Sequence, residues 1–264
     1  MKNRSRTLPV VFFINVLVLS LLACSMLMSI PANTDPPSPV PPSATSAPLI
    51  SQQVILVPQV LSETNQNPPF TIKAQTPQLT GSDESRVTGF NQQLKDLVNK
   101  EVDIWRESFQ QNTVVINGSS LDESYTLISQ IGDLWSLKFD FRFYSDGAAH
   151  PGLYSITLNY DLGRGRELTL GDLFLPNSSY LETIASYCIT ELSKQPGFDG
   201  PFTDGAKPTP ENYRSWNITP DGLLITFDTY QVSPGASGPQ QVLVPFAQLE
   251  KVIDPQGSLA GIIK

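Results

Sequence analysis

Histidine, cysteine and charged side chains are scarce in this sequence, and each scarcity narrows the possible functions. The 264 residues include one histidine, His150, and two cysteines, Cys24 and Cys188. Zinc sites usually take several His or Cys ligands, so we expect no zinc centre and no cofactor. The net charge is −8 and no run of Lys or Arg occurs. Because an acidic surface repels phosphate backbones, nucleic acid is not an expected partner.

Sequence motifs for common catalytic sites are also missing. The chain has no Gly-x-Ser-x-Gly turn for a hydrolase serine, no phosphate-binding loop and no metalloprotease helix. It also has no Asp-x-Asp-x-Asp-Gly loop for calcium. These absences favour a binding protein over an enzyme, without deciding between them.

The first recognisable feature of the sequence is a predicted export signal over residues 1–23. Three basic residues precede an apolar run from Leu8 to Ala23, which is the layout of a secretory signal peptide. The run is shorter than the roughly 20 residues that a membrane-spanning helix needs. It ends in Leu21-Leu22-Ala23-Cys24, which resembles the bacterial lipobox, whose cysteine is lipidated. The alternatives are an ordinary secretory signal cut near Ala32 and an uncleaved anchor.

A tether follows at residues 24–50. Its segment from Pro31 to Pro48 consists mainly of Pro, Ser, Ala and Thr. Such a composition buries too little apolar surface to fold, and proline keeps it extended. A lipid at Cys24 would make the membrane a partner and would leave Cys188 without a disulfide partner. We expect Cys188 to be a small buried hydrophobe.

The folded part is predicted to combine helices and strands. Val54–Val60 and Phe70–Ala74 are typical of strands, and Ser82 is a plausible helix N-cap. Apolar residues from Val87 to Phe109 then recur at helical spacing, which predicts one long amphipathic helix.

After Gly118 the apolar period changes to two. Tyr125–Ile131 and Leu134–Tyr144 alternate on either side of Gly132-Asp133, which predicts an antiparallel hairpin. In its second arm one face is expected to be core: Trp135, Leu137, Phe139, Phe141 and Phe143.

The remainder predicts a strand, a helix, a hairpin, a closing strand and a last helix, in that order: Tyr154–Asp161, Asn177–Lys194, Trp216–Tyr230, Val242–Val244 and Phe246–Ile253. Strands and helices do not alternate strictly, so the predicted class is α+β.

One group of motifs is distinctive enough to suggest a family. The chain contains Gly147-Ala148-Ala149-His150-Pro151, then Asn159-Tyr160-Asp161-Leu162, Gly165-Arg166 and Leu170-Gly171-Asp172-Leu173-Phe174. These motifs, in this order, resemble the extracellular domain shared by RsiV-type anti-sigma factors and PdaC-type peptidoglycan deacetylases.

This resemblance implies two mixed subdomains, each with antiparallel strands packed on one long helix: a PdaC-like one at 51–122 and an RsiV-like one at 123–264. In the family this domain senses lysozyme or precedes a metal-dependent deacetylase. We expect neither the sigma-binding nor the deacetylase part in this chain, so those roles are not carried over.

Six side chains near the family motifs or the irregular loop at 232–239 are candidates for ligand binding: Tyr144, Asp146, His150, Tyr160, Asp161 and Tyr230. Tyrosine rings suit sugar faces and protein interfaces, but they also suit the edge of a core. A His-Pro pair in a Gly-rich turn can fix a loop, and Asp residues at such positions often cap turns. No catalytic residue is assigned.

The leading hypothesis is a non-catalytic envelope lipoprotein that binds a cell-wall glycan or a lysozyme-like protein. One alternative is an enzyme acting on peptidoglycan or a related polysaccharide, with His150 and nearby acids in its site. Another is a structural lipoprotein without a small ligand.

Mass spectrometry of the mature protein tests the lipobox prediction. We expect an N-terminal Cys24 that carries fatty-acyl groups, in the membrane fraction of a bacterial host. An unmodified N-terminus near Ala32 would instead identify a secreted protein.

Overall fold

The structure is a computed structural model that describes residues 54–262. The predicted signal peptide, the lipidation site Cys24 and the tether at 24–50 lie outside the described residues. Within them, no helix is both long and apolar enough to cross a bilayer.

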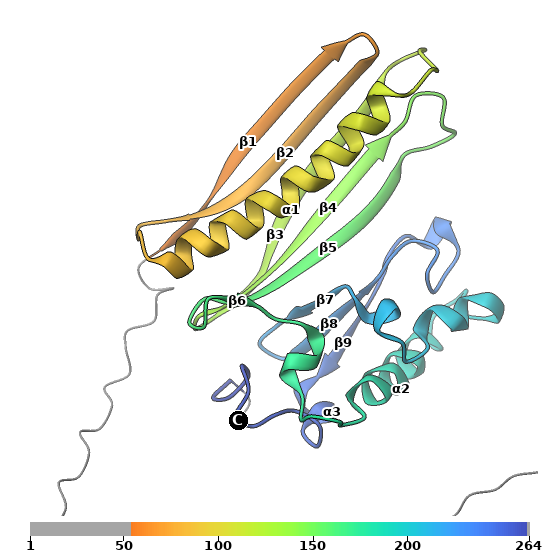
Figure 1. Cartoon of the computed structure of the whole chain (residues 1–264). Helices are drawn as coiled ribbons and strands as arrows, with labels where there is room; N and C mark the ends of the chain where they lie inside the picture. The colour runs from red at the N-terminus through yellow and green to blue at the C-terminus, as the bar shows by residue number, and fades with distance from the viewer. Residues whose placement is uncertain (1–53, 263–264) are drawn as a thin grey trace, which may run out of the picture. The chain divides into compact units, whose positions relative to one another are not determined.

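Six strands form the first sheet, in the order β1-β2-β3-β4-β5-β6 (Figure 1). Neighbouring strands are antiparallel, except that Phe70–Lys73 of β2 pairs in parallel with Ser119–Asp122 of β3. The strand bounds are β1 (Ile55–Gln66), β2 (Pro69–Thr80), β3 (Ser119–Ile131), β4 (Leu134–Tyr144), β5 (Gly152–Asp161) and β6 (Arg166–Glu167).

One long helix, α1 (Ser85–Gln110), covers one face of this sheet and connects β2 to β3. Its buried stripe is Val87, Phe90, Leu94, Val98, Val102 and Phe109. These side chains share one core with Trp135, Leu137, Phe139 and Phe141 of β4, and Phe143 packs against it. The predicted core face of this strand is therefore confirmed. Full burial of each large apolar side chain contributes about 1.5–3 kcal/mol.

A second, three-stranded sheet lies over the opposite face (Figure 1). Its antiparallel strands are β7 (Trp216–Ile218), β8 (Gly222–Phe227) and β9 (Gln240–Pro245). They share a hydrophobic core with α2 (Tyr180–Leu192) and α3 (Phe246–Leu249). Within residues 54–262, four 3-10 helices lie in the connections: η2 (Leu170–Leu173), η3 (Gly200–Ala206), η4 (Pro210–Tyr213) and η5 (Gly235–Ser237).

The mixed α and β class is confirmed, but the finer expectation of two subdomains on one long helix each is not. The first sheet contains a parallel pair, and α2 has 13 residues where α1 has 26. The expected boundary after residue 122 falls inside β3, which pairs with strands on both sides. The division into 51–122 and 123–264 stays a prediction.

Several element bounds differ from the expectation. β1 and β2 continue into polar sequence, because they form a hairpin at the sheet edge where one face meets solvent and needs no apolar pattern. The N-cap of α1 is Glu84, and the Ser82 hydroxyl instead accepts the Glu84 N–H at 3.3 Å. The last helix ends at Leu249, four residues before the predicted Ile253.

A buried carboxylate lies where β2 and β3 separate. Their pairing ends at Lys73 and Asp122, and the next residue, Glu123, accepts the Gln75 N–H through its carboxylate at 2.5 Å. Burial raises the pKa of Glu123 to about 7. The Glu123 carboxylate thus accepts a backbone N–H that has no partner from β3 at this point.

Polar side chains of the first sheet hold the second sheet in place. Asn159 of β5 accepts the Ile218 N–H at 3.1 Å and donates to the Trp216 carbonyl at 2.8 Å. Ser136 of β4 accepts the same Ile218 N–H at 3.0 Å, and Thr157 accepts the Trp216 N–H at 3.1 Å. The edge N–H and C=O groups of β7 are therefore hydrogen-bonded to side chains on the face of the first sheet, where a further strand would otherwise be needed.

Replacing Asn159 with Ala tests this contact. The buried Trp216 carbonyl would lose its hydrogen-bond partner, so we expect the unfolding free energy to fall by about 1–3 kcal/mol. Urea denaturation gives the value. Asn99→Ala, on the exposed side of α1, should change stability by less than about 0.5 kcal/mol. An equally small effect at both positions would contradict the described role of Asn159.

Candidate functional site

Asp146, the acid of the β4–β5 connection, holds a neighbouring loop. Its carboxylate oxygen Oδ2 accepts N–H groups from Ile116 at 2.6 Å, Asn117 at 2.9 Å and Gly118 at 2.8 Å. These hydrogen bonds, with that of Ile116 foremost, keep the pKa of Asp146 below its usual range. The residue is only 5% exposed. Asp146 therefore fixes the loop after α1, although it also borders a surface hollow that Glu107, Asn112 and Ser145 line.

Tyr144 and His150 flank Asp146 in the same connection. Tyr144 is half-buried at the end of β4. His150 is exposed, and its ring nitrogen Nδ1 lies 3.0 Å from the Pro151 carbonyl oxygen. This contact suits the predicted role of a loop-fixing histidine.

Tyr160 and Asp161 lie at the other end of β5. The Tyr160 ring is buried 4.8 Å from that of Phe90. Asp161 accepts the Arg164 N–H at 2.9 Å and the Ser258 hydroxyl at 3.2 Å, so it caps the turn after the strand, as expected of such acids.

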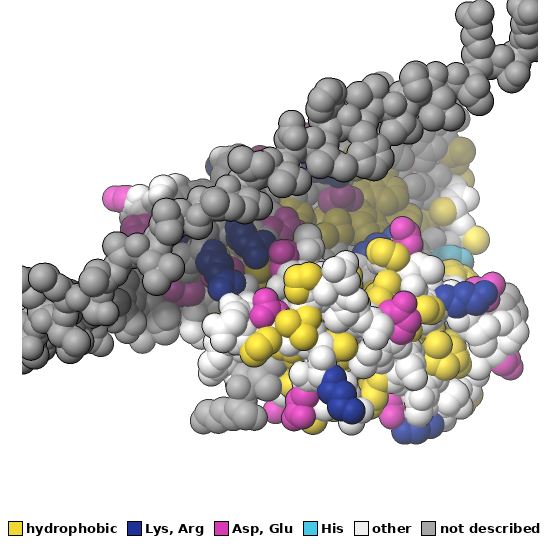
Figure 2. Space-filling view, turned by 60° about the horizontal axis from the view of Figure 1, so that its bottom comes forward, with side chains coloured by type: hydrophobic (Ala, Val, Ile, Leu, Met, Phe, Trp, Pro, Cys, Tyr) yellow, Lys and Arg dark blue, Asp and Glu magenta, His cyan; other side chains and the backbone are white. Residues whose placement is uncertain are grey.

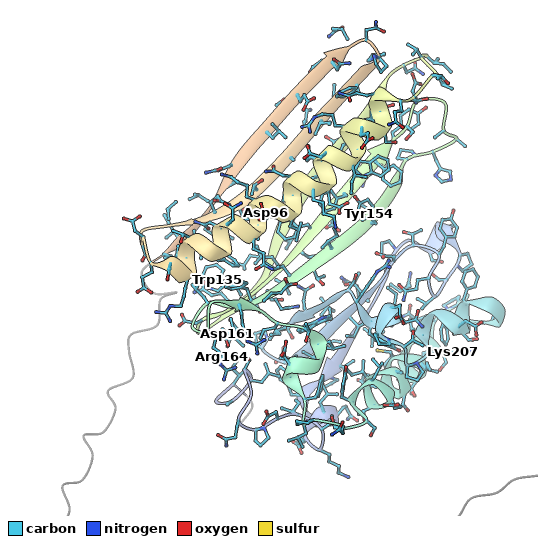
Figure 3. The ribbon with its side chains drawn as sticks, viewed as in Figure 1. Asp96, Trp135, Tyr154, Asp161, Arg164 and Lys207 are labelled. Carbon is cyan, nitrogen blue, oxygen red and sulfur yellow. The ribbon has the colours of Figure 1, made fainter. Side chains whose placement is uncertain are left out.

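The structure does not bring the six candidates together. Asp161 is the last of the ten residues of β5, and the His150 connection precedes the first, a span of about 30 Å at the usual rise per residue. Figure 3 shows Tyr154 and Asp161 toward opposite ends of this strand. Tyr230 is in a third place, the connection between β8 and β9, where it is 62% exposed with a φ of 71°. Their role in ligand binding stays a prediction.

The described residues show no activated nucleophile. The hydrogen bond recorded for the His150 ring is to a backbone carbonyl, not to a serine or a carboxylate. Burial raises the pKa of the Cys188 thiol to about 12, so the thiolate is not formed near neutral pH. No group of three or more His, Cys, Asp or Glu side chains in residues 54–262 could hold a metal ion.

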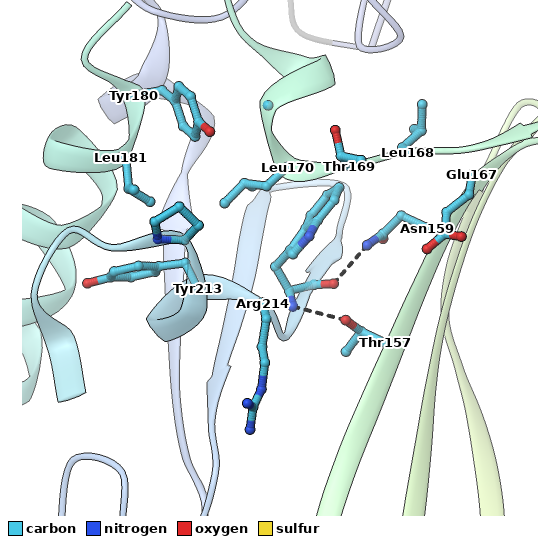
Figure 4. A pocket seen from close by; sticks show the side chains of 13 residues that line it. Thr157, Asn159, Glu167, Leu168, Thr169, Leu170, Tyr180, Leu181, Tyr213 and Arg214 are labelled. Carbon is cyan, nitrogen blue, oxygen red and sulfur yellow. Dashed lines mark hydrogen bonds between the residues drawn. The ribbon is translucent and has the colours of Figure 1, made fainter. Parts of the chain in front are cut away.

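A cavity of about 380 Å³ lies between the two sheets, and the sequence patterns did not predict it (Figure 4). Its lining comes from β5, the end of β6 and the segment after it, the start of α2, and η4 through the first residue of β7: Thr157, Asn159, Glu167, Leu168, Thr169, Leu170, Gly171, Tyr180, Leu181, Pro210, Tyr213, Arg214 and Trp216. This volume is within the range of small-ligand sites.

The cavity combines an apolar wall with a polar rim. Leu170, Tyr180 and Leu181 lie on one side of it, and Glu167 and Thr169 lie along another (Figure 4). Burial raises the pKa of Glu167, whose carboxylate also accepts a hydrogen bond from the Gln93 amide. Rings and aliphatic side chains beside neutral and charged hydrogen-bonding groups are suited to an amphipathic ligand such as a sugar.

Part of this lining could have been noticed in the sequence. Asn159 and Leu170-Gly171 belong to the family motifs, but their proximity to Tyr213 and Trp216 depends on contacts more than 40 residues apart. Asp172 of the same motif instead closes a local turn, since it accepts the Thr169 N–H and hydroxyl at 2.7 Å each. Residues 170–171 of this motif thus line the cavity, and Asp172 of the same motif fixes the turn that holds them there.

Comparison with known proteins confirms the resemblance inferred from the motifs. Residues 171–247 match the family model described as protein of unknown function DUF3298. The chain is 26% identical over 172 residues to peptidoglycan-N-acetylmuramic acid deacetylase PdaC of Bacillus subtilis, covering 62% of this chain and 36% of that protein. An esterase of Mycobacterium tuberculosis is 30% identical over 105 residues, covering 39% and 46% of the two chains.

The fold is also found in solved structures. A DUF3298 family protein from Bacteroides fragilis aligns with a TM-score of 0.56 at 15% identity, covering 76% of this chain and 94% of that one. This likeness concerns the fold alone. The present chain spans less than half the length of the two curated relatives.

The lowered pKa of Asp146 predicts a pH dependence of stability. Because the folded pKa is depressed, the contribution of the ionised carboxylate is present above its unfolded pKa, about 3.9, and is lost as pH falls through the folded value. Asp146→Asn should be less stable than wild type at pH 7, and the difference should shrink in acid. Urea midpoints measured between about pH 7 and pH 2.5 give the comparison. Asn117→Ala, in the same loop, should keep the wild-type acid dependence, and a constant difference for Asp146→Asn would contradict the assignment.

Proposed function

We propose that this chain is an exported envelope protein, attached to the membrane by a lipid at Cys24, whose folded part binds a cell-wall glycan without transforming it. The observation that carries the proposal is the cavity between the two sheets, with its apolar wall and polar rim. The similarity to a peptidoglycan deacetylase supports a wall polymer as the ligand class. A lysozyme-like protein is the alternative ligand.

Non-catalytic binding is favoured by the same geometry. A hydrolase of the serine type needs a nucleophile within hydrogen-bond reach of its base. His150, the one histidine, contacts Pro151 and lies at the far end of β5 from Asn159 in the cavity lining. The similarity to an esterase makes the enzymatic alternative worth testing in the same experiment.

Calorimetric titration of the full chain with soluble muropeptides tests glycan binding. We expect a single site whose affinity falls at least tenfold in Tyr180→Ala, because that ring borders the cavity. Tyr187→Ala, on the same helix but outside the cavity lining, should bind like wild type. Glu167→Gln, which preserves size, reports on the rim if the Tyr180 variant is unstable.

Three outcomes would change the proposal. No heat with any muropeptide would remove glycan binding. Binding of lysozyme that is unaffected by either cavity variant would move recognition to another surface and favour a protein ligand. Turnover of a wall polymer or an ester that disappears in His150→Gln, with the fold intact, would identify an enzyme.

A further inference from the structure

Three chain connections meet at one end of the first sheet, which we term the apolar end and define as residues 64–71, 110–120 and 144–152 (Figure 1). They pack closely: a Cβ added at Gly118 would lie 3.0 Å from the Pro69 carbonyl oxygen, and one at Gly147 would lie 2.7 Å from Val114 Cγ1. Asp146 joins the second and third connections through its three N–H hydrogen bonds. The apolar end is thus one fixed surface built from distant parts of the chain.

Charge is scarce within these three connections, although Glu107 of α1 lines a hollow together with Gln111, Asn112 and Ser145. Among the side chains of the connections, the only carboxyl, amino, guanidinium or imidazole groups are those of Asp146 and His150. Asp146 is buried with its carboxylate already hydrogen-bonded, so His150 is the single exposed titratable group of this kind. Elsewhere acidic and basic side chains are scattered over the surface, as the face in Figure 2 shows. Moving the three connections out of water would therefore cost little free energy for the desolvation of charged groups.

Three consecutive aliphatic side chains project from it. Val114 is 43% exposed, Val115 58% and Ile116 70%. A run of exposed aliphatic residues is unfavourable in water unless something covers it. Neutral hydrogen-bonding residues, Asn112 and Asn117, stand on either side of the run.

The size and composition of the surface distinguish between possible occupants. The aliphatic run alone is too small for a stable dimer, which buries about 800 Å² on each partner. Protein interfaces rely mainly on Trp, Tyr and Arg, whereas this projection is aliphatic only. A lipid surface needs only a few apolar side chains at the acyl boundary, with neutral polar groups at headgroup level. A lack of cations favours lipids without net charge, because anionic lipids attract basic segments.

We propose that the apolar end inserts Val114, Val115 and Ile116 into the interface of a bilayer of uncharged lipids. Asp146 holds the inserting loop in shape, so the insertion requires no ordering of the chain. This contact is independent of the cavity between the sheets and of its ligand.

Tryptophan placed in the loop measures the insertion directly. The full chain with Val115→Trp is mixed with vesicles of phosphatidylcholine brominated on the acyl chains, and the signal of the three native tryptophans is subtracted using wild type. We expect a blue shift and quenching of the added emission. Both should be smaller with an equimolar mixture of phosphatidylcholine and phosphatidylglycerol, because the protein is acidic. Ile116→Trp serves if Val115→Trp does not fold.

The matched control is Leu243→Trp, at a 40% exposed position on β9 of the second sheet. Its emission should be unchanged even though the apolar segment near the N-terminus can bind the same vesicles. Adding Ile116→Asp to Val115→Trp should abolish the quenching. Solvent-exposed emission from both loop positions, or equal quenching at position 243, would overturn the proposal.

Discussion

The structure depends on one contact, in which side chains on the face of one sheet satisfy the backbone of a strand in another. Ser136, Thr157 and Asn159 present their polar atoms to Trp216 and Ile218, at distances of 2.8–3.1 Å. Unpaired N–H and C=O groups would be costly there, since Trp216 and Ile218 are almost fully buried. The contact therefore fixes where the second sheet sits and in which direction β7 runs.

Two features of the molecule follow from that contact. The first sheet becomes a middle layer, with α1 packed on one face and the second sheet on the other. Because β7 contacts only part of β5, space remains beside it, and that space is the cavity between Thr157, Tyr180 and Tyr213. Asn159 thus belongs both to the cavity lining and to the contact that creates the cavity. The apolar end lies beyond this layer, at the ends of β1 to β5, where no second sheet supplies polar contacts.

Local sequence patterns predicted the helix and strands whose buried residues recur at a regular spacing. The alternation from Trp135 to Phe143 gave the buried face of β4, and the helical spacing from Val87 to Phe109 gave α1. The polar hairpin arms after Leu61 carry no such pattern, because solvent covers one of their faces. The candidate site was harder to predict. Asp146, Asp161 and Asp172 stand out in the sequence, but each satisfies a nearby turn or loop. The cavity requires knowing that β5 lies beside β7, more than 50 residues later, which no local period encodes.

Native-state hydrogen exchange at the Ile218 amide tests the role of this contact most directly. If Ser136 and Asn159 join the two sheets into one cooperative structure, Ile218 should exchange with the same opening free energy as Phe139 in the first core, within about 1 kcal/mol. Exchange of Ile218 through a lower-energy opening that leaves Phe139 protected would show that the second sheet detaches alone. That result would contradict the account.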